Sequence, residues 1–203
     1  MKKLILFDLD GVLIDSRDNM EHAWSAVQDR LLVDTPFSDY FELVGRPFSD
    51  ILKILGLESK TKEIDQIFKA ASMESMHLIK FYPDVKNTLL YLKNKGIKLG
   101  VVTSKDLVRT KKILSKFLFD FDVVQSPNDR YRGKPAPDHL LLSMAITNTD
   151  PDDTIYIGDM NVDFEAASRA NIDYLHATWG YQISPKIDVV TISSFKDILE
   201  RII

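Results

Sequence analysis

The sequence predicts an α/β fold: a doubly wound, mostly parallel sheet with a small α-helical unit inserted after the first strand. Apolar runs of strand length, at residues 4–7, 97–102 and 154–157, alternate with stretches of helical periodicity. Repeated strand–helix units of this kind favour a parallel sheet covered by helices on both faces. Residues 17–80 interrupt the alternation, because they read as helical without an intervening strand.

The first part of the chain contains one strand and the helical insertion. The run at residues 4–7 is long enough for one buried strand and too short for a helix core. Ser16 is a good N-cap for the helix that follows. The apolar stripe of that helix consists of Met20, Ala23, Trp24, Val27 and Leu31. Pro36 and Pro47 divide the next segment into short pieces, and a further helix is expected over about residues 62–78.

From residue 82 onwards, helices and strands alternate. Gly96 is a natural end for the helix marked by Val85, and Asn171 tolerates the left-handed conformation at the end of another. Strands are expected at residues 97–102, 121–124, 154–157, 174–177 and 189–192. The other helices are expected at residues 107–117, 140–146, 162–170 and from about residue 194 to the end.

Two descriptions of the insertion fit this pattern. In the first, residues 1–15 and 81–203 form the sheet core and residues 16–80 form a separate helical domain. In the second, the helical segment is a connecting excursion packed on the core. We expect the first arrangement.

Composition restricts the class of protein. The 203 residues are 45% hydrophobic and 28% charged, as in an ordinary globular protein. A formal charge of -4 gives no reason to expect nucleic acid or an anionic membrane as a partner. The chain has no cysteine, which excludes disulfides and thiolate metal sites. The apolar stretch after Met1-Lys2-Lys3 is too short for a signal peptide, so a cytoplasmic location is expected. The oligomeric state stays open, with a monomer favoured.

Polar side chains are expected where the strands end, because doubly wound sheets bind ligands beyond the carboxyl ends of their strands. The residues that follow the predicted strands are Asp8, Asp10, Thr103, Ser104, Lys134, Asp159 and Asp163. If strand geometry persists, Asp8 and Asp10 point the same way, and Gly11 then allows a tight turn. Two such carboxylates repel each other unless a cation lies between them or one holds a proton. The pattern therefore indicates a metal site or a catalytic pair.

An oxygen-rich set without cysteine or histidine favours Mg²⁺ over zinc or copper. Hydroxyl groups and a lysine beside the metal suit a phosphate group, whose oxygens a lysine binds as a point charge. Asp8 is then the expected nucleophile, forming an aspartyl-phosphate. Asp10 is expected to protonate the leaving oxygen and later to accept a proton from water.

Each residue also has a purely structural interpretation. Thr103 and Ser104 could cap the helix that begins near Asp106. Lys134 could be an ordinary solvated lysine. Asp159 and Asp163 could lie near a helix start only because its dipole favours negative charge there. Coincidence at four separate strand ends is much less probable than at one, which favours the site.

The ordered motifs resemble those of the haloacid dehalogenase-like (HAD) superfamily, over essentially the whole chain. The first, Asp-Leu-Asp-Gly-Val-Leu-Ile-Asp-Ser, covers residues 8–16, and the second ends at Thr103. The third, a lysine before Pro-x-Pro, is Lys134 with residues 135–137, and the fourth, Gly-Asp-x-x-x-Asp, covers residues 158–163. The resemblance implies a Rossmann-like core with a small helical cap.

The resemblance also implies ligands and substrate. Mg²⁺ would be held by Asp8, the backbone carbonyl of Asp10 and Asp159, with Asp163 nearby. The substrate would be a small phosphorylated metabolite, and Ser104 would belong to its binding site. Arg46, in a turn between cap helices, is expected to bind an anionic or hydroxylated substrate, the alternative being a solvated arginine.

Three features separate branches of the superfamily. Dehalogenases resembling the founding members lack an aspartate at the position of Asp10, so Asp10 favours phosphoryl transfer. The β-phosphoglucomutase-like branch has a cap histidine where this chain has Met20, which is either cap core or a substrate contact. Trp179-Gly180-Tyr181 resembles the phosphoglycolate phosphatase-like branch. We therefore expect a phosphatase; the alternatives are a phosphomutase and a catalytically silent binding protein.

Overall fold

The computed structural model describes residues 2–182 and 189–202. Within this part of the chain, six strands form one sheet in the order β5-β4-β1-β6-β7-β8, and every neighbouring pair is parallel. The strands are β1 (Leu4–Phe7), β4 (Lys98–Val102), β5 (Val123–Gln125), β6 (Thr154–Gly158), β7 (Asp173–Ala177) and β8 (Thr191–Ile192). The predicted doubly wound sheet is therefore confirmed.

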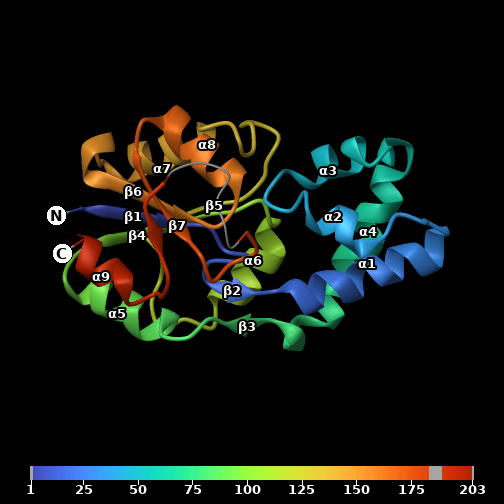
Figure 1. The fold of residues 1–203 in the computed structure, drawn as a ribbon, viewed down its shortest axis with the longest axis horizontal. Coiled ribbons are helices and arrows are strands. Elements are labelled where there is room, and N and C mark those ends of the chain that lie inside the picture. The colour runs from blue at the N-terminus through green and yellow to red at the C-terminus, as the bar shows by residue number, and fades with distance from the viewer. Residues whose placement is uncertain (1, 183–188, 203) are drawn as a thin grey trace.

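Helices cover both faces of this sheet (Figure 1). They are α5 (Val85–Asn94), α6 (Leu107–Leu114), α7 (Asp138–Thr147), α8 (Asn161–Ala170) and α9 (Asp197–Ile202). The central strand β1 shows why its sequence is continuously apolar. Its residues Ile5 and Phe7 join one buried cluster with residues of α5 and α9, whereas Leu4 and Leu6 join another with residues of α7 and α8. A strand that is buried on both faces carries apolar residues at successive positions, without polar alternation.

The inserted helices form a second group of packed elements, which we call the helical lobe (α1–α4, residues 17–74), at the right of Figure 1. Its helices are α1 (Arg17–Leu31), α2 (Phe37–Phe41), α3 (Phe48–Ile54) and α4 (Thr61–Glu74). Pro36 and Pro47 directly precede α2 and α3, in agreement with the predicted breaks. A separate cluster of buried residues joins the four helices, with Trp24 stacked on Tyr40 at a ring distance of 4.6 Å.

Two short strands connect the lobe to the sheet core. β2 (Ile14–Asp15) pairs in antiparallel fashion with β3 (Lys80–Phe81), so the chain leaves the core and returns to it side by side. The sequence did not predict this pairing, because two residues per strand are too few for a periodic pattern. The 3₁₀ turns at Glu58–Lys60, Met76–Leu78 and Pro151–Asp153 were equally unpredicted.

Several predicted boundaries are wrong by a few residues. The helix expected to residue 78 ends at Glu74, and the strand expected at residues 189–192 begins at Thr191. The last helix begins at Asp197, because the Asp197 carboxylate accepts hydrogen bonds from the backbone N–H groups of Ser193 and Ser194, which form the preceding turn. Ile203, the expected end of that helix, lies outside the described residues.

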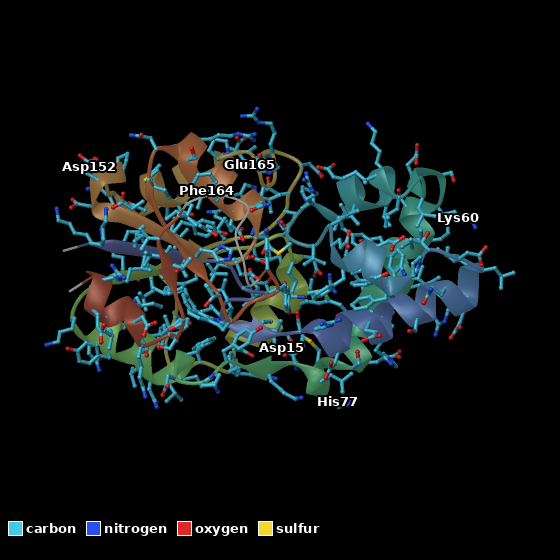
Figure 2. The ribbon with its side chains drawn as sticks, in the orientation of Figure 1. Asp15, Lys60, His77, Asp152, Phe164 and Glu165 are labelled. Atoms are coloured by element: carbon cyan, nitrogen blue, oxygen red, sulfur yellow. The ribbon has the colours of Figure 1, made fainter. Side chains whose placement is uncertain are left out.

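Charged side chains occupy the periphery. Lys60, His77 and Asp152 are exposed at the outer ends of the lobe, the connection and the sheet core (Figure 2). Among the described helices, none has both the length and the apolar character needed to cross a membrane.

Trp24→Ala is expected to lower the free energy of unfolding by about 3–5 kcal/mol, the cost of removing a large buried side chain. Trp24 is fully buried, and its Nε1 donates a 2.9 Å hydrogen bond to the carbonyl of Thr35. Urea denaturation measures the loss. Leu32→Ala is the control, because Leu32 is 85% exposed and should change stability by less than about 0.5 kcal/mol. Similar losses in both variants would contradict the prediction.

Candidate active site

The predicted residues meet at the carboxyl edge of the sheet, where it faces the helical lobe. A cavity of about 50 Å³ lies between the two. Its lining includes the predicted residues Asp8, Asp10, Met20, Arg46, Thr103 and Ser104. Lys134, Asp159 and Asp163 are buried next to Asp8. The structure thus brings together side chains from both ends of the chain and from the lobe.

Asp8 directly follows β1 and is held there by the sheet. Its backbone N–H donates a 2.9 Å hydrogen bond to the carbonyl of Ile157 in the neighbouring strand β6. The chain then turns at Gly11, which has φ +83°. A Cβ atom at Gly11 would lie 2.0 Å from Oδ2 of Asp159. Only glycine therefore allows the turn to lie this close to Asp159.

Three buried carboxylates form the acidic part of the site. One oxygen from each of Asp8, Asp159 and Asp163 lies within 4.8 Å of the others. Oδ2 of Asp159 accepts a 2.7 Å hydrogen bond from the backbone N–H of Tyr181, but Oδ1 has no hydrogen-bond partner among the described residues. A buried carboxylate oxygen without a partner is costly, and a hard divalent cation with oxygen ligands can satisfy it. The donor set fits Mg²⁺.

Lys134 neutralises part of this charge. Its Nζ lies 3.0 Å from Oδ1 of Asp8 and 2.7 Å from Oδ1 of Asp163, and the residue is only 4% exposed. The interpretation as a solvated lysine is therefore wrong. Tyr156 completes the arrangement, because its hydroxyl lies 3.2 Å from Nζ and 3.1 Å from Oδ1 of Asp163.

Asp163 has a second set of contacts that fixes the loop after β6. Its Oδ2 accepts hydrogen bonds from the backbone N–H groups of Asp159 and Met160, at 3.2 and 3.0 Å. Asp163 lies in the first turn of α8, as the helix-dipole interpretation requires. The helix-dipole interpretation therefore applies to this residue, and its position beside Asp8 and Asp159 is compatible with the predicted site.

Burial dominates the electrostatics of the acidic group. It raises the pKa of Asp8 to about 7; Lys134 opposes this effect, and Asp163 and Asp10 add to it. Burial, with the nearby charges of Asp163 and Asp8, raises the pKa of Asp159 well above its ordinary value. Burial alone lowers the pKa of Lys134, but the charges of Asp163 and Asp8 outweigh it and raise that pKa.

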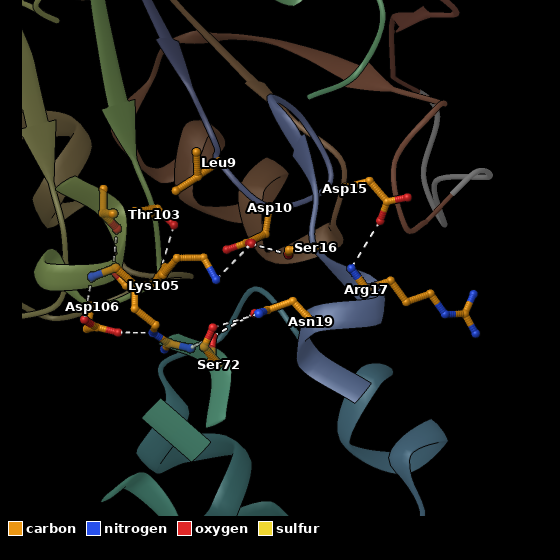
Figure 3. A network of polar contacts seen from close by, with 12 residues as sticks. Leu9, Asp10, Asp15, Ser16, Arg17, Asn19, Ser72, Thr103, Lys105 and Asp106 are labelled. Carbon is orange, nitrogen blue, oxygen red and sulfur yellow. Dashed lines mark hydrogen bonds and ion pairs between the residues drawn. The ribbon is translucent and has the colours of Figure 1, made fainter. Parts of the chain in front are cut away.

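Asp10 lines the same cavity but has different partners from Asp8. Its Oδ1 accepts a hydrogen bond from the hydroxyl of Ser16 and lies 3.1 Å from Nζ of Lys105 (Figure 3). The strand ends at Phe7, so the geometry expected to align Asp8 and Asp10 does not persist. Ser16 is the N-cap residue of α1, as predicted, but its side chain makes no capping hydrogen bond, because its hydroxyl donates to the Asp10 carboxyl group instead.

The two hydroxyl residues after β4 do not cap the next helix. Asp106 caps α6, since its carboxylate accepts from the backbone N–H groups of Val108 and Arg109. Oγ1 of Thr103 accepts a 3.1 Å hydrogen bond from the N–H of Lys105. The hydroxyl of Ser104 donates a 2.6 Å hydrogen bond to the carbonyl of Gly45, and so ties the sheet edge to the lobe.

Two cationic residues of the cavity were missed by the sequence analysis. Lys105 and Arg109 both line it and are 6% and 7% exposed. Nη1 of Arg109 donates a 3.0 Å hydrogen bond to Oγ of Ser72 in α4, which in turn donates to Asn19 in α1 (Figure 3). Lys105 follows a strand end, where polar residues were expected. Nothing in the sequence marked Arg109 as a buried cavity residue, because most arginines are exposed.

The predicted lobe residues lie on the other side of the cavity. Arg46 lines it and is partly exposed, so it is not a fully solvated arginine. Met20 is 4% exposed and belongs both to the buried cluster of the lobe and to the cavity lining. Met20 therefore belongs to the core of the lobe, and a contact with substrate stays a prediction.

Fold and site together define the class of protein: an α/β protein with a buried acidic group and a lysine at the carboxyl edge of its sheet. The family model described as haloacid dehalogenase-like hydrolase matches residues 5–177. The chain belongs to the haloacid dehalogenase-like hydrolase family.

Named relatives and solved structures agree with this assignment. The chain is 30% identical to the phosphoglycolate phosphatase of Aquifex aeolicus, over 98% of this chain and 95% of that protein. It is 25% identical to the phosphoglycolate phosphatase of Pseudomonas putida, over 100% of this chain and 79% of that protein. A haloacid dehalogenase-like family hydrolase from Streptococcus pneumoniae matches with a TM-score of 0.82 at 20% identity, over 98% of both chains, and shares the fold.

Mg²⁺ is expected to stabilise the protein more strongly at about pH 8 than at about pH 5.5. Raised folded-state pKa values, as for Asp8 and Asp159, favour folding at low pH, and this contribution is lost as pH rises through the folded-state pKa. Mg²⁺ would bind the ionised carboxylates and would therefore compete with protons. At about 100 times Kd it should add about 2.7 kcal/mol to the free energy of unfolding.

Thermal unfolding with and without Mg²⁺ at both pH values measures this effect. Asp159→Asn should abolish the Mg²⁺-dependent rise in Tm, whereas Asp152→Asn, at an exposed aspartate, should preserve it. A rise that is equal at both pH values, or larger at the lower one, would refute the prediction.

Proposed function

We propose that the chain is a Mg²⁺-dependent phosphatase that hydrolyses a small phosphomonoester through an aspartyl-phosphate intermediate. One observation carries the proposal: the buried carboxylate of Asp8 lies beside Lys134 and within 4.8 Å of the oxygens of Asp159 and Asp163. This arrangement joins a nucleophile, a cation for phosphate oxygens and a divalent-metal donor set in one place.

Asp8 and Asp159 would hold Mg²⁺, together with the backbone carbonyl of Asp10 and with Asp163 nearby. When bound, the cation polarises the phosphoryl group and offsets its negative charge. Lys134, fixed between Asp8 and Asp163, binds a phosphoryl oxygen as a point charge. The hydroxyl of Thr103, on the cavity wall, binds another.

The first chemical step transfers the phosphoryl group to the protein. A carboxylate oxygen of Asp8 attacks phosphorus and forms a new P–O bond, while the bond to the ester oxygen breaks. The electron pair of that bond stays on the leaving oxygen, which takes a proton from Asp10 and departs as an alcohol. Asp8 carries the phosphoryl group at the end of this step.

The second step restores the carboxylate. Water loses a proton to Asp10 and attacks phosphorus, and the bond between phosphorus and Asp8 breaks. Inorganic phosphate leaves, Asp8 is a free carboxylate again, and Asp10 holds the proton needed for the next cycle. The same residue therefore acts first as an acid and then as a base.

We propose that residues 16–80 act as a cap domain that moves to admit the substrate. The cavity of about 50 Å³ has room for a few water molecules only, and substrate pockets are usually several times larger. Ser104 and Gly45, and Arg109 and Ser72, form the contacts that such a movement would break. Arg46 and Met20 then contact the non-phosphate part of the substrate.

The names of two relatives support a choice of substrate class. The two phosphatases described above are named for phosphoglycolate, so phosphoglycolate and sugar phosphates are the first esters to test. A phosphomutase is less well supported, because the thioether of Met20 on the cavity wall exchanges no proton.

Asp8→Asn is expected to lower Mg²⁺-dependent hydrolysis of an aryl phosphate by about 10³-fold or more, because it removes the nucleophile. Phosphate release measures the rate, and acid-quenched protein from the wild type should carry an acid-stable but hydroxylamine-sensitive phosphoryl group. Asp152→Asn, at an exposed aspartate, is the matched control and should retain full activity. Equal turnover by the Asp8 variant would rule out the mechanism.

A panel of phosphorylated metabolites, scored by phosphate release, then identifies the substrate. Isomerisation of a sugar phosphate that exceeds phosphate release and needs a bisphosphate primer would favour the phosphomutase. Absence of activity across the panel would favour a binding protein.

A further inference from the structure

The segment Trp179-Gly180-Tyr181, which follows β7, contacts the loop that carries Asp8 and Asp10. Nε1 of Trp179 donates a 3.1 Å hydrogen bond to the carbonyl of Val12. A Cβ atom at Gly180 would lie 2.4 Å from Cβ of Asp159 and 2.6 Å from the carbonyl oxygen of Gly11. The segment therefore lies against both the loop and the acidic group, although the mechanism above gives it no role.

Tyr181 makes three kinds of contact there. Its backbone N–H donates to Oδ2 of Asp159 at 2.7 Å. Its hydroxyl oxygen accepts a 2.9 Å hydrogen bond from the backbone N–H of Ser16, and lies 3.0 Å from Oγ of the same residue. Its ring lies 4.8 Å from the ring of Phe41 in α2 of the lobe.

The direction of these hydrogen bonds follows from a count of protons. The hydroxyl of Ser16 has one proton, which it donates to Oδ1 of Asp10 (Figure 3). The hydroxyl of Tyr181 must then be the donor toward Oγ of Ser16. The result is a relay in which Tyr181 donates to Ser16 and Ser16 donates to Asp10. Chains of this kind strengthen each of their hydrogen bonds.

We propose that Tyr181 is a positioning residue for proton transfer at Asp10, an inference that rests on the proposed phosphatase function. Through Ser16, its hydroxyl fixes Oδ1 of the Asp10 carboxylate, which Lys105 contacts as well. Oδ2 of Asp10 is then the oxygen that passes the proton to the leaving group. The relay donates to the carboxylate that remains after this transfer, and so stabilises it.

The contact with Phe41 links this relay to the lobe. Because the ring of Tyr181 packs against α2 while its hydroxyl binds Ser16, the position of the lobe and the orientation of Asp10 depend on the same side chain. Asp10 is thus aligned when the lobe lies against the sheet. When the lobe is open, Asp10 is not held in this orientation, so it does not act as an aligned acid toward water in the site.

Comparison of two aryl esters tests the proposal. Phenyl phosphate has a more basic leaving group than 4-nitrophenyl phosphate, and so depends more on protonation by Asp10. With Mg²⁺ present, Tyr181→Phe should lower kcat/KM for phenyl phosphate by about tenfold. The value for 4-nitrophenyl phosphate should stay within about twofold. A purely structural role would lower both values by the same factor, which would overturn the proposal.

Two substitutions at Ser16 extend the test, one that keeps the hydroxyl group and one that removes it. Ser16→Thr keeps the hydroxyl and should preserve the wild-type ratio of the two esters, whereas Ser16→Ala should shift it as Tyr181→Phe does. The double variant should show the shift of one single variant, because both interrupt one relay. Additive shifts would overturn the relay. Tyr174→Phe is the control, because its hydroxyl binds His176 at 3.1 Å and not the relay.

Failure of the proposed function gives a different result. If the wild type releases phosphate from neither aryl ester nor any member of the metabolite panel, the phosphatase function is overturned, and the catalytic role of Tyr181 with it. If the wild type hydrolyses both esters and the ratio is unchanged in Tyr181→Phe, only the role of Tyr181 is overturned. Thermal unfolding tests the relay independently of activity, in the wild type, Tyr181→Phe, Ser16→Ala and the double variant. Additive losses in Tm overturn the relay, and sub-additive losses support it.

Discussion

The constraint on which the structure depends is the burial of three carboxylates close together. Oxygens of Asp8, Asp159 and Asp163 lie within 4.8 Å of one another, with one buried lysine, Lys134, in direct contact. Burying unpaired charge costs several kcal/mol per ion. Because burial disfavours the charged form, the pKa values of Asp8 and Asp159 are raised, and both groups tend to hold protons. A divalent cation would remove that tendency, which supports the proposed metal site.

The surrounding chain supports this cluster from several directions. The parallel sheet places the ends of β1 and β6 side by side, and therefore brings Asp8 and Asp159 together. Gly11 leaves space for Asp159, and the backbone N–H of Tyr181 fixes one of its oxygens. The lobe closes the opposite side through Ser104 and Arg109. The remaining cavity of about 50 Å³ has room for a few water molecules.

The sequence predicted those features in which a pattern of one residue type has a single physical cause. The apolar runs predicted the strands because a central strand is buried on both faces, and the carboxyl-end rule then located Asp8, Thr103 and Asp159. Prediction failed where a contact joins distant segments. Nothing local to Ser16 indicates that its hydroxyl turns away from its helix toward Asp10, and nothing in α6 marks Arg109 as buried against the lobe.

Asp8 and Asp10 show how environment separates two residues of one short motif and supports a different proposed function for each. Asp8 faces Lys134 and two further carboxylates, so it belongs to the charged cluster where a metal and a phosphoryl group would meet. Asp10 contacts a hydroxyl and a second lysine, Lys105, whose pKa burial lowers although the charge of Asp10 opposes that effect. Carboxylates in such different surroundings suit different roles, a nucleophile in one case and an acid–base group in the other. The strand ends at Phe7, before Asp8 and Asp10, whereas a continued strand would have placed both side chains on the same face of the sheet.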